Sequence, residues 1–216
     1  MANEIVVYIQ RFSWILVALV LVFGWISPIL MVLAIVCMFG PIIFAFSYGR
    51  AWCGNFCPRG SLSGVVLPII SPNKPIPRLL KSDAFRVIIF VLLMMLFVNN
   101  LAHSNGTLLG IGMAFIKMMA ITTIMQICFA ALIHPYAWCS FCPMGSVAFF
   151  ITRTRRGTID NIKINKNCVG CNVCKNKCPF QIDIPSWSPQ GEVKDADCMK
   201  CRKCLKACPR KCLKYE

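Results

Sequence analysis

Two cysteine runs near the C-terminal end have the spacing of iron–sulfur ligands. Each follows the pattern Cys-x2-Cys-x2-Cys-x3-Cys-Pro, the spacing of bacterial ferredoxins. Three closely spaced thiolates hold one 4Fe-4S cluster, and the fourth cysteine, redirected by the proline, completes the other cluster. The predicted ligands are Cys168, Cys171, Cys174 and Cys208 for cluster 1, and Cys198, Cys201, Cys204 and Cys178 for cluster 2.

The form of the two runs favours clusters over zinc, and neighbouring residues add to the predicted sites. Paired zinc sites are the alternative, but two complete four-cysteine runs that each end in Cys-Pro favour clusters. Cys212 is left over and is predicted to be structural or incidental. Ile182 and Ile184 follow the first run, and we expect them to pack on cluster sulfurs and exclude water, which tunes the redox potential.

Four more cysteines form two pairs, here called the paired cysteines. Cys53 and Cys57 precede Pro58, and Cys139 and Cys142 precede Pro143; these four are the paired cysteines. Three hypotheses compete: a shared third metal centre, either 4Fe-4S or zinc; two redox-active dithiol pairs; or a structural role. Cys37 and Cys128 lie in apolar segments and are predicted to be small core residues.

The paired cysteines belong to an internal repeat. Residues 51–61 (AWCGNFCPRGS) match residues 137–146 (AWCSFCPMGS) with one residue deleted. Each copy follows two apolar helical segments and precedes a short apolar segment, at 62–70 and 147–151. Two copies of the same orientation predict a parallel pseudo-repeat, and this favours convergence of the four thiols on one centre.

Long apolar segments must position these motifs. Residues 12–49 contain no charged side chain, and a single helix of that length would span nearly twice the hydrocarbon core of a bilayer. We therefore predict a turn at Ser27-Pro28, and a kink or break at Gly40-Pro41. A polar connector (71–83) leads to the third helix, and Ser82 is the predicted N-cap of that helix. An uncharged turn region (99–112) leads to the fourth helix. Transmembrane helices are predicted at about 8–26, 28–48, 84–102 and 113–133.

The predicted architecture has two parts. Residues 1–152 form an α-helical membrane domain of four transmembrane helices in two parallel helix-pair repeats. Residues 153–216 form a small α+β ferredoxin domain of the bacterial type with two 4Fe-4S clusters. The turns at 24–28 and 99–112 carry no Lys or Arg, so the positive-inside rule predicts a multi-pass protein of the inner (cytoplasmic) membrane with both termini cytoplasmic.

Composition narrows the class of protein. The chain has 216 residues, of which 57% are hydrophobic and 15 are cysteine. A secreted disulfide scaffold fits poorly, because we expect no cleavable signal peptide and eight cysteines match metal-binding runs. The net charge is +15, but each oxidised cluster with its thiolates contributes about −2. The remaining charge suits membrane lipid headgroups or an acidic redox partner, and nucleic acid is not predicted as a partner.

Two ionisable residues are candidates for a quinone site. His103 lies at the outer end of the third predicted helix, and Lys117 lies one turn into the fourth. Either can exchange a proton near a quinone carbonyl, as intramembrane ionisable residues often do. The alternative is that His103 is solvated and Lys117 extends to the interface. Gln126 is polar and lies in the middle of the fourth predicted helix.

The motifs together resemble a known family. A repeated Trp-Cys-x2/3-Cys-Pro-x-Gly motif (52–60 and 138–145), followed by a double ferredoxin run, resembles the NapH/NosR-type membrane iron–sulfur proteins over about residues 10–212. The resemblance implies four membrane helices, cytoplasmic clusters and electron transfer, with quinol oxidation proposed for some members. The second pair departs from the family's usual three-residue gap by having two residues.

The sequence thus predicts a membrane-bound iron–sulfur electron-transfer subunit of an oxidoreductase complex. It would relay electrons between a cytoplasmic carrier or partner protein and the quinone pool or a membrane partner. One alternative is a metal-centre maturation protein, which uses the paired cysteines to reduce or deliver a metal such as copper. Another is a redox sensor or anchor.

Overall fold

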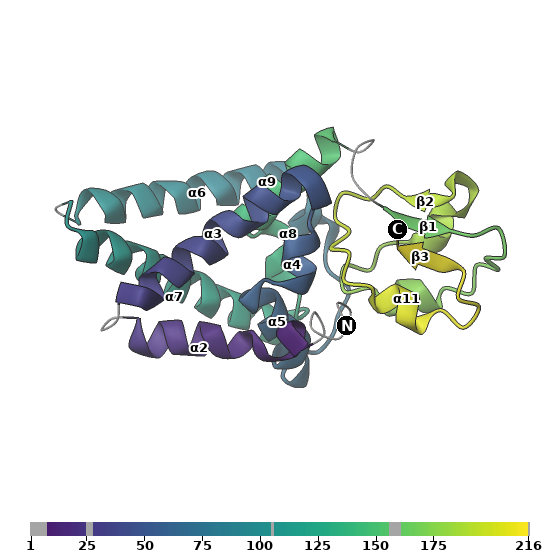
Figure 1. Cartoon of the computed structure of the whole chain (residues 1–216), viewed down its shortest axis with the longest axis horizontal. Coiled ribbons are helices and arrows are strands. Elements are labelled where there is room, and N and C mark those ends of the chain that lie inside the picture. Colours follow the sequence, from purple (N-terminus) through teal and green to yellow (C-terminus); the bar gives the residue numbers. More distant parts are fainter. Residues whose placement is uncertain (1–7, 25–27, 105, 156–160, 216) are drawn as a thin grey trace.

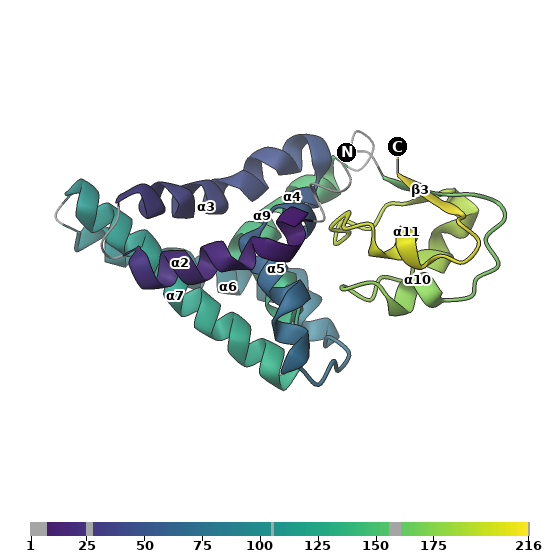
Figure 2. The same ribbon diagram turned by 60° about the horizontal axis from the view of Figure 1, so that its bottom comes forward.

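The protein consists of a helical part and a small C-terminal part that contains a three-stranded sheet (Figure 1). The structure is a computed structural model, and it describes residues 8–24, 28–104, 106–155 and 161–215. The C-terminal part lies at one end of the helices in both views (Figures 1 and 2). The helical part ends with α9 at Thr154, two residues beyond the predicted boundary.

Long apolar helices occupy the four predicted segments. They are α2 (Trp14–Phe23), α3 (Pro28–Tyr48), α6 (Asp83–Ala102) and α7 (Leu108–Leu132). The predicted cap of α6 is confirmed, because the Ser82 side chain accepts a hydrogen bond from Phe85 N–H. The α7 helix begins earlier than predicted, because the Thr107 side chain accepts from Gly110 N–H and caps it.

The predicted kink or break and the predicted N-cap of the second helix both concern α3. Of the predicted kink or break at Gly40-Pro41, the break is wrong, since α3 continues through Pro41, and the kink stays a prediction. An internal proline removes one helical hydrogen bond, and packing can hold the helix together around it. Ser27, the predicted N-cap of the second helix, lies outside the described residues.

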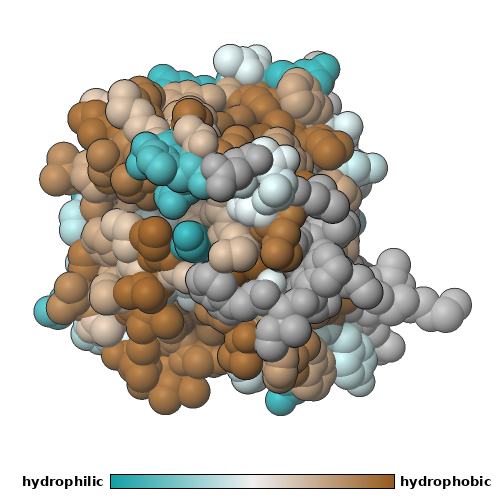
Figure 3. All heavy atoms as spheres, turned by 90° about the vertical axis from the view of Figure 1, so that its left-hand side faces the viewer, coloured by the Kyte–Doolittle hydropathy of each residue, from teal (hydrophilic) through white to brown (hydrophobic). Residues whose placement is uncertain are grey.

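The described part contains two helices long and apolar enough to cross a membrane. They are α6 and residues Leu109–Leu132 of α7, whereas the apolar stretches Trp14–Phe23 and Ile35–Tyr48 are shorter. Only 11% of the α6 span and 33% of the α7 span is buried inside the protein. Figure 3 views the end of the helical part away from the C-terminal part, and hydrophobic residues cover most of it. The helices thus present apolar side chains outward.

The repeat folds as two copies of one short unit. In the first copy α4 (Ala51–Asn55) leads to α5 (Pro58–Val65), and in the second α8 (Ala137–Phe141) leads to α9 (Pro143–Thr154). The proline of each motif is the first residue of the second helix, where its missing N–H and fixed φ cost little. The apolar segments that follow the motifs are therefore continuations of these helices, with a 3₁₀ turn, η1 (Leu67–Ile69), after α5.

Short connecting elements complete the helical part. A 3₁₀ turn, η2 (Arg78–Lys81), ends the polar connector before α6. The motif helices α4, α5, α8 and α9 lie at the end of the bundle that faces the C-terminal part (Figure 1). The paired cysteines therefore lie at the same end of the long helices as the two cysteine runs of the C-terminal part.

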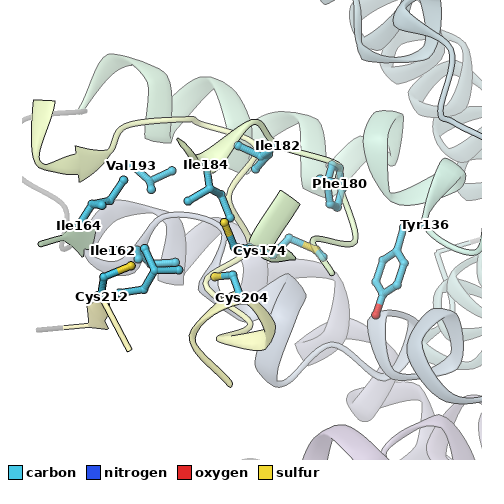
Figure 4. Packing of buried hydrophobic residues seen from close by; sticks show 12 residues of the cluster. Tyr136, Ile162, Ile164, Cys174, Phe180, Ile182, Ile184, Val193, Cys204 and Cys212 are labelled. Atoms are coloured by element: carbon cyan, nitrogen blue, oxygen red, sulfur yellow. The ribbon is translucent and has the colours of Figure 1, made fainter. Parts of the chain in front are cut away.

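The C-terminal part folds around its cysteines. Its elements are β1 (Ile162–Ile164), α10 (Val173–Asn176), η3 (Ile184–Gln190), β2 (Glu192–Val193), α11 (Lys203–Ala207) and β3 (Leu213–Tyr215). The strands are antiparallel in the order β2-β1-β3. Ile162, Ile182, Ile184 and Val193 form its core with Cys174 and Cys204 (Figure 4). The core is small, and sulfur atoms make up part of it.

Asp197 joins the C-terminal part to the helical part through two buried arginines. Arg50 Nη1 donates to Asp197 Oδ1 over 2.5 Å, and Arg86 Nη2 donates to Oδ1 and Oδ2 over 2.9 and 2.8 Å. Arg50 Nη2 also donates to the carbonyl oxygen of Cys139. The arginines are 1% and 0% exposed. Because Asp197 precedes Cys198, this network fixes the second cysteine run against the helices.

Phe180, two residues after Cys178, is the second docking point. Its ring lies 5.0 Å from the Arg50 guanidinium, and its centroid lies 6.4 Å from that of Tyr136. Lys81 Nζ donates to the Phe180 carbonyl oxygen over 2.6 Å. Arg50 and Tyr136 directly precede α4 and α8, so equivalent positions of the two repeat copies contact the same aromatic side chain.

Gly54 permits a close backbone contact between the two parts. A Cβ at this position would lie 2.3 Å from the Met199 carbonyl oxygen and 3.2 Å from Cys201 Cβ. Any side chain there would push the C-terminal part away. Gly54 follows Cys53 in the chain, so the first of the paired cysteines lies next to a predicted ligand of cluster 2.

We predict that Asp197→Ala destabilises the folded protein by about 3–5 kcal/mol, because the change leaves two buried arginines without their carboxylate. The measurement is denaturant unfolding in detergent, with hydrogen exchange to locate the loosened region. The control is Asp83→Ala, which removes the ion pair with Arg153, where both side chains are 49% exposed. That loss should be about 0–1 kcal/mol. Equal losses in the two variants would contradict the importance of the Asp197 network.

Candidate iron–sulfur sites

The predicted ligands of cluster 1 line one cavity. Cys168, Cys171, Cys174 and Cys208 surround a space of about 350 Å³, called here the distal cavity. They come from the loop before α10, from α10 itself and from the segment after α11. The structure thus brings together three cysteines of the first run and the last cysteine of the second, which is the crossed grouping expected from the spacing.

The predicted ligands of cluster 2 line another cavity, called here the proximal cavity. Cys178, Cys198, Cys201 and Cys204 surround about 390 Å³, together with Ile182 and Ile184. The two isoleucines are 7% and 3% exposed. They therefore lie at the cavity and keep water from it, which lowers the local dielectric and influences the potential of a bound cluster.

The grouping of the cysteines bears on the choice between clusters and zinc. Each cavity is lined by three cysteines of one run and the last cysteine of the other run. This crossed grouping is typical of proteins with two 4Fe-4S clusters. Among the described residues, no group of three or more His, Cys, Asp or Glu side chains that could hold a single metal ion is found.

Cys212 lies inside the distal cavity. Its Sγ is 3.3 Å from Cys208 Sγ, and its side chain is 6% exposed. The backbone near it pairs with the start of the first run, since Asn165 N–H donates to the Cys212 carbonyl oxygen. The leftover cysteine is thus packed beside cluster 1's predicted ligands, and its structural or incidental role stays a prediction.

The paired cysteines converge between the two repeat copies. Cys53, Cys57 and Cys142 line a cavity of about 740 Å³ in the helical part, called here the bundle cavity. Cys139 lies within electrostatic range of the other three thiols, and its Sγ is 3.7 Å from Ser63 Oγ. Cys53 and Cys139 also pack against the core of the C-terminal part. Two thiols from each copy therefore meet at the end of the bundle nearest to the proximal cavity.

Burial changes the pKa of the paired cysteines and therefore their reactivity. It raises the pKa of Cys53 and of Cys139 to about 12. A redox-active dithiol needs an accessible thiolate with a low pKa. A metal, by contrast, displaces the thiol proton when it binds. The surroundings of the paired cysteines therefore favour ligation over thiol–disulfide exchange.

A polar network supports the bundle cavity. Arg59 lines the cavity, and its Nη2 donates to Thr122 Oγ1 and to the Met119 carbonyl oxygen. Gln126 Nε2 donates to the Arg59 carbonyl oxygen and to Ser63 Oγ over 2.9 and 2.8 Å. In the described part of the chain Arg59 Nε has no hydrogen-bond partner. Gln126 is thus a structural residue that ties α7 to α5, and Arg59 keeps a donor unused.

Other sequence-predicted residues lie apart from the sites. His103 caps the end of α6, with Nδ1 2.8 Å from the Asn99 carbonyl oxygen, and Lys117 is exposed on α7. Neither lines the bundle cavity. Cys128 is exposed, so its prediction as a core residue is wrong. Cys37 lines the bundle cavity, which no sequence signal indicates, because its helix carries no cysteine motif.

The three cysteine groups follow one another through the molecule. The segments that dock on the helices contain Cys178, Cys198 and Cys201, all predicted ligands of cluster 2. The distal cavity is lined only by residues of the C-terminal part, and the bundle cavity only by residues of the helical part. The order is therefore distal cavity, proximal cavity, paired cysteines.

Comparison with known families agrees with this chemistry. The family described as "4Fe-4S binding domain" matches residues 30–77 and 117–160, which contain the paired cysteines. The family described as "4Fe-4S dicluster domain" matches residues 167–213, which contain both cysteine runs. The chain is an iron–sulfur, ferredoxin-like protein. Membership of the NapH/NosR-type proteins stays a prediction.

Two curated relatives come from one organism, and their names state no activity. The chain is 27% identical to the uncharacterized protein MJ0749 of Methanocaldococcus jannaschii over 184 residues, 81% of this chain and 67% of the relative. It is 26% identical to the uncharacterized protein MJ0750 of the same organism over 189 residues, 81% of this chain and 75% of the relative. No solved structure matches the chain.

We predict that Cys178→Ser changes cluster 2, although Cys178 belongs to the first run. Serine is a weaker ligand for iron than thiolate, so the variant should lose or alter one EPR signal of the reduced protein. That spectrum should match the spectrum of Cys201→Ser and differ from that of Cys171→Ser. A Cys178→Ser spectrum that matches Cys171→Ser would mean that each run holds its own cluster.

Proposed function

We propose that this protein is a membrane-bound iron–sulfur electron-transfer subunit. It carries electrons between a soluble carrier or partner protein and the quinone pool or a partner in the membrane. The observation that carries the proposal is the continuous order of the three cysteine groups from the distal cavity to the helices. A 4Fe-4S cluster takes up and releases one electron at a time, and the protein supplies ligation, burial and position.

The membrane location rests on the helices. The spans in α6 and α7 are long enough to cross a bilayer, and their low internal burial is unlike the core helix of a soluble protein. We propose that α2, together with the helical residues 8–12 before it, and α3 also cross, which gives four transmembrane helices. The turns opposite the cysteine motifs lack Lys and Arg, so both termini would lie on the cytoplasmic side of the inner membrane.

We propose that the paired cysteines hold a third 4Fe-4S cluster. Each repeat copy supplies two thiols, the thiols are buried, and the matched 4Fe-4S binding domain contains both pairs. Gly54 would keep this centre close to cluster 2, because the backbone after Cys53 touches the segment that holds Cys201. Any side chain larger than glycine's hydrogen would widen that gap.

The bundle cavity offers a place for a quinone head group. Besides the thiols, apolar side chains of α3, α6 and α7 line it, including Met38, Met94 and Phe115. Such a lining suits a quinone ring, and the unused donor of Arg59 suits a carbonyl oxygen. We therefore place the quinone here rather than at His103 or Lys117, which lie outside the cavity.

One observation favours the alternative role in metal-centre maturation. The bundle cavity also contains thioether and thiol groups, which are soft ligands that select copper(I). They belong to Cys37, Met38, Met94, Met118, Met119 and Met144. A protein that reduces or delivers copper would use these groups beside the paired cysteines.

We predict that the double variant Cys53→Ser/Cys139→Ser stops quinol-linked reduction of the clusters in the C-terminal part. The reason is that the connecting centre loses two of its four ligands. The measurement is the optical bleaching of the clusters after addition of a quinol analogue, with the metal content of the partner enzyme measured in parallel. Cys128→Ser, on the exposed side of α7, is the matched control and should behave like the unchanged protein.

The outcomes separate the two functions. Loss of reduction with normal metal in the partner supports the relay. Loss of metal from the partner enzyme supports maturation. Unchanged reduction in the double variant would contradict the proposed path through the paired cysteines.

A further inference from the structure

The distal cavity opens on the surface of the C-terminal part. Val169 is 59% exposed, and Cys171 and Pro209 beside the same cavity are also exposed. The proximal cavity, by contrast, borders the segments that dock on the helical part. The loop between β1 and α10, which carries Cys168 and Cys171, runs along the side of the molecule away from the helices (Figure 1). Cluster 1 is therefore the one that a soluble molecule can approach.

The segments that hold cluster 1 are basic. Residues 165–177 and 203–215 contain eight Lys and Arg side chains and no Asp or Glu. Within the described residues, Asp183 pairs with Lys175, and Glu192 pairs with Lys194. Seven exposed cations of these segments have no ion-pair partner in the described part of the chain: Lys166, Lys177, Lys203, Lys206, Arg210, Lys211 and Lys214. Four of them lie within three residues of Cys168 or Cys208 in the chain, namely Lys166, Lys206, Arg210 and Lys211.

These features define one surface, called here the distal surface. It has a small apolar centre, Val169 and Pro209, next to Cys171, and the four cations close to Cys168 or Cys208 in the chain lie in the segments around it. Transient electron-transfer interfaces are small, and opposite charges steer the partners together. The cations would attract an acidic protein, and the apolar centre would let it approach the ligand loop closely.

We propose that the distal surface docks an acidic soluble electron-carrier protein beside cluster 1. The proposal rests on the electron-transfer function proposed above, and it names the partner class and the cluster at which electrons enter or leave. A protein is favoured over anionic lipid, because the surface faces away from the end of the C-terminal part that contacts the helices (Figures 1 and 2).

The experiment compares two charge-reversal variants of the full-length protein in nanodiscs of neutral lipid. Lys166→Glu/Arg210→Glu reverses two charges on the distal surface. Lys74→Glu/Arg78→Glu reverses two exposed charges on the connector before α6 and is the matched control. The probe is a strongly acidic soluble ferredoxin. Its dissociation constant and its rate of electron exchange with the protein are measured between low and physiological salt, after EPR has verified the clusters in each variant.

The distal variant should bind the acidic ferredoxin about tenfold more weakly at low salt and should lose most of the salt dependence. The connector variant should bind like the unchanged protein. The proposal is overturned if both variants weaken binding equally, if neither does, or if the distal charges matter only in nanodiscs of anionic lipid. Charge-dependent binding without electron exchange would leave the docking surface intact and contradict the electron-transfer function instead.

Discussion

The carboxylate of Asp197 is the contact on which the arrangement of the molecule depends. Two arginines that are almost completely buried come together at it, one from the turn between α3 and α4 and one from the first turn of α6. Burying a cation is costly unless a carboxylate and hydrogen bonds compensate for it, so these arginines require a partner from the C-terminal part. The neighbouring residue is Cys198, and the position of cluster 2 is thereby tied to the helical part.

Both copies of the duplicated helical unit contribute to the docking of the C-terminal part. Arg50 and Tyr136, which directly precede α4 and α8, both contact Phe180, so the two copies bind the same segment of the C-terminal part. Each copy also contributes two buried thiols to the group of paired cysteines. A repeat that docks a ferredoxin-like part and gathers four cysteines beside it is well suited to passing electrons between a soluble side and a membrane side.

The sequence predicted the elements well because its signals are local. Cysteine spacing predicted the two groupings of the C-terminal part, and apolar segments predicted the positions of the long helices. It could not predict the contacts that join the two parts, since the approach at Gly54 depends on residues about 145 positions apart in the chain. For the same reason the sequence does not predict that Cys37 lines the bundle cavity, nor the contacts of Arg50, Arg59 and Arg86. Arginines of a membrane protein are read first as topology signals.

The central claim is that the electron path continues from the C-terminal part into the paired cysteines. The most direct test is the iron and acid-labile sulfide content of the purified full-length protein, counted per chain and supported by EPR spin quantification. Three clusters predict about twelve irons per chain, and replacement of Cys139 by serine should lower the count toward eight. A count of about eight irons in the unchanged protein would confine the clusters to the C-terminal part and contradict the account.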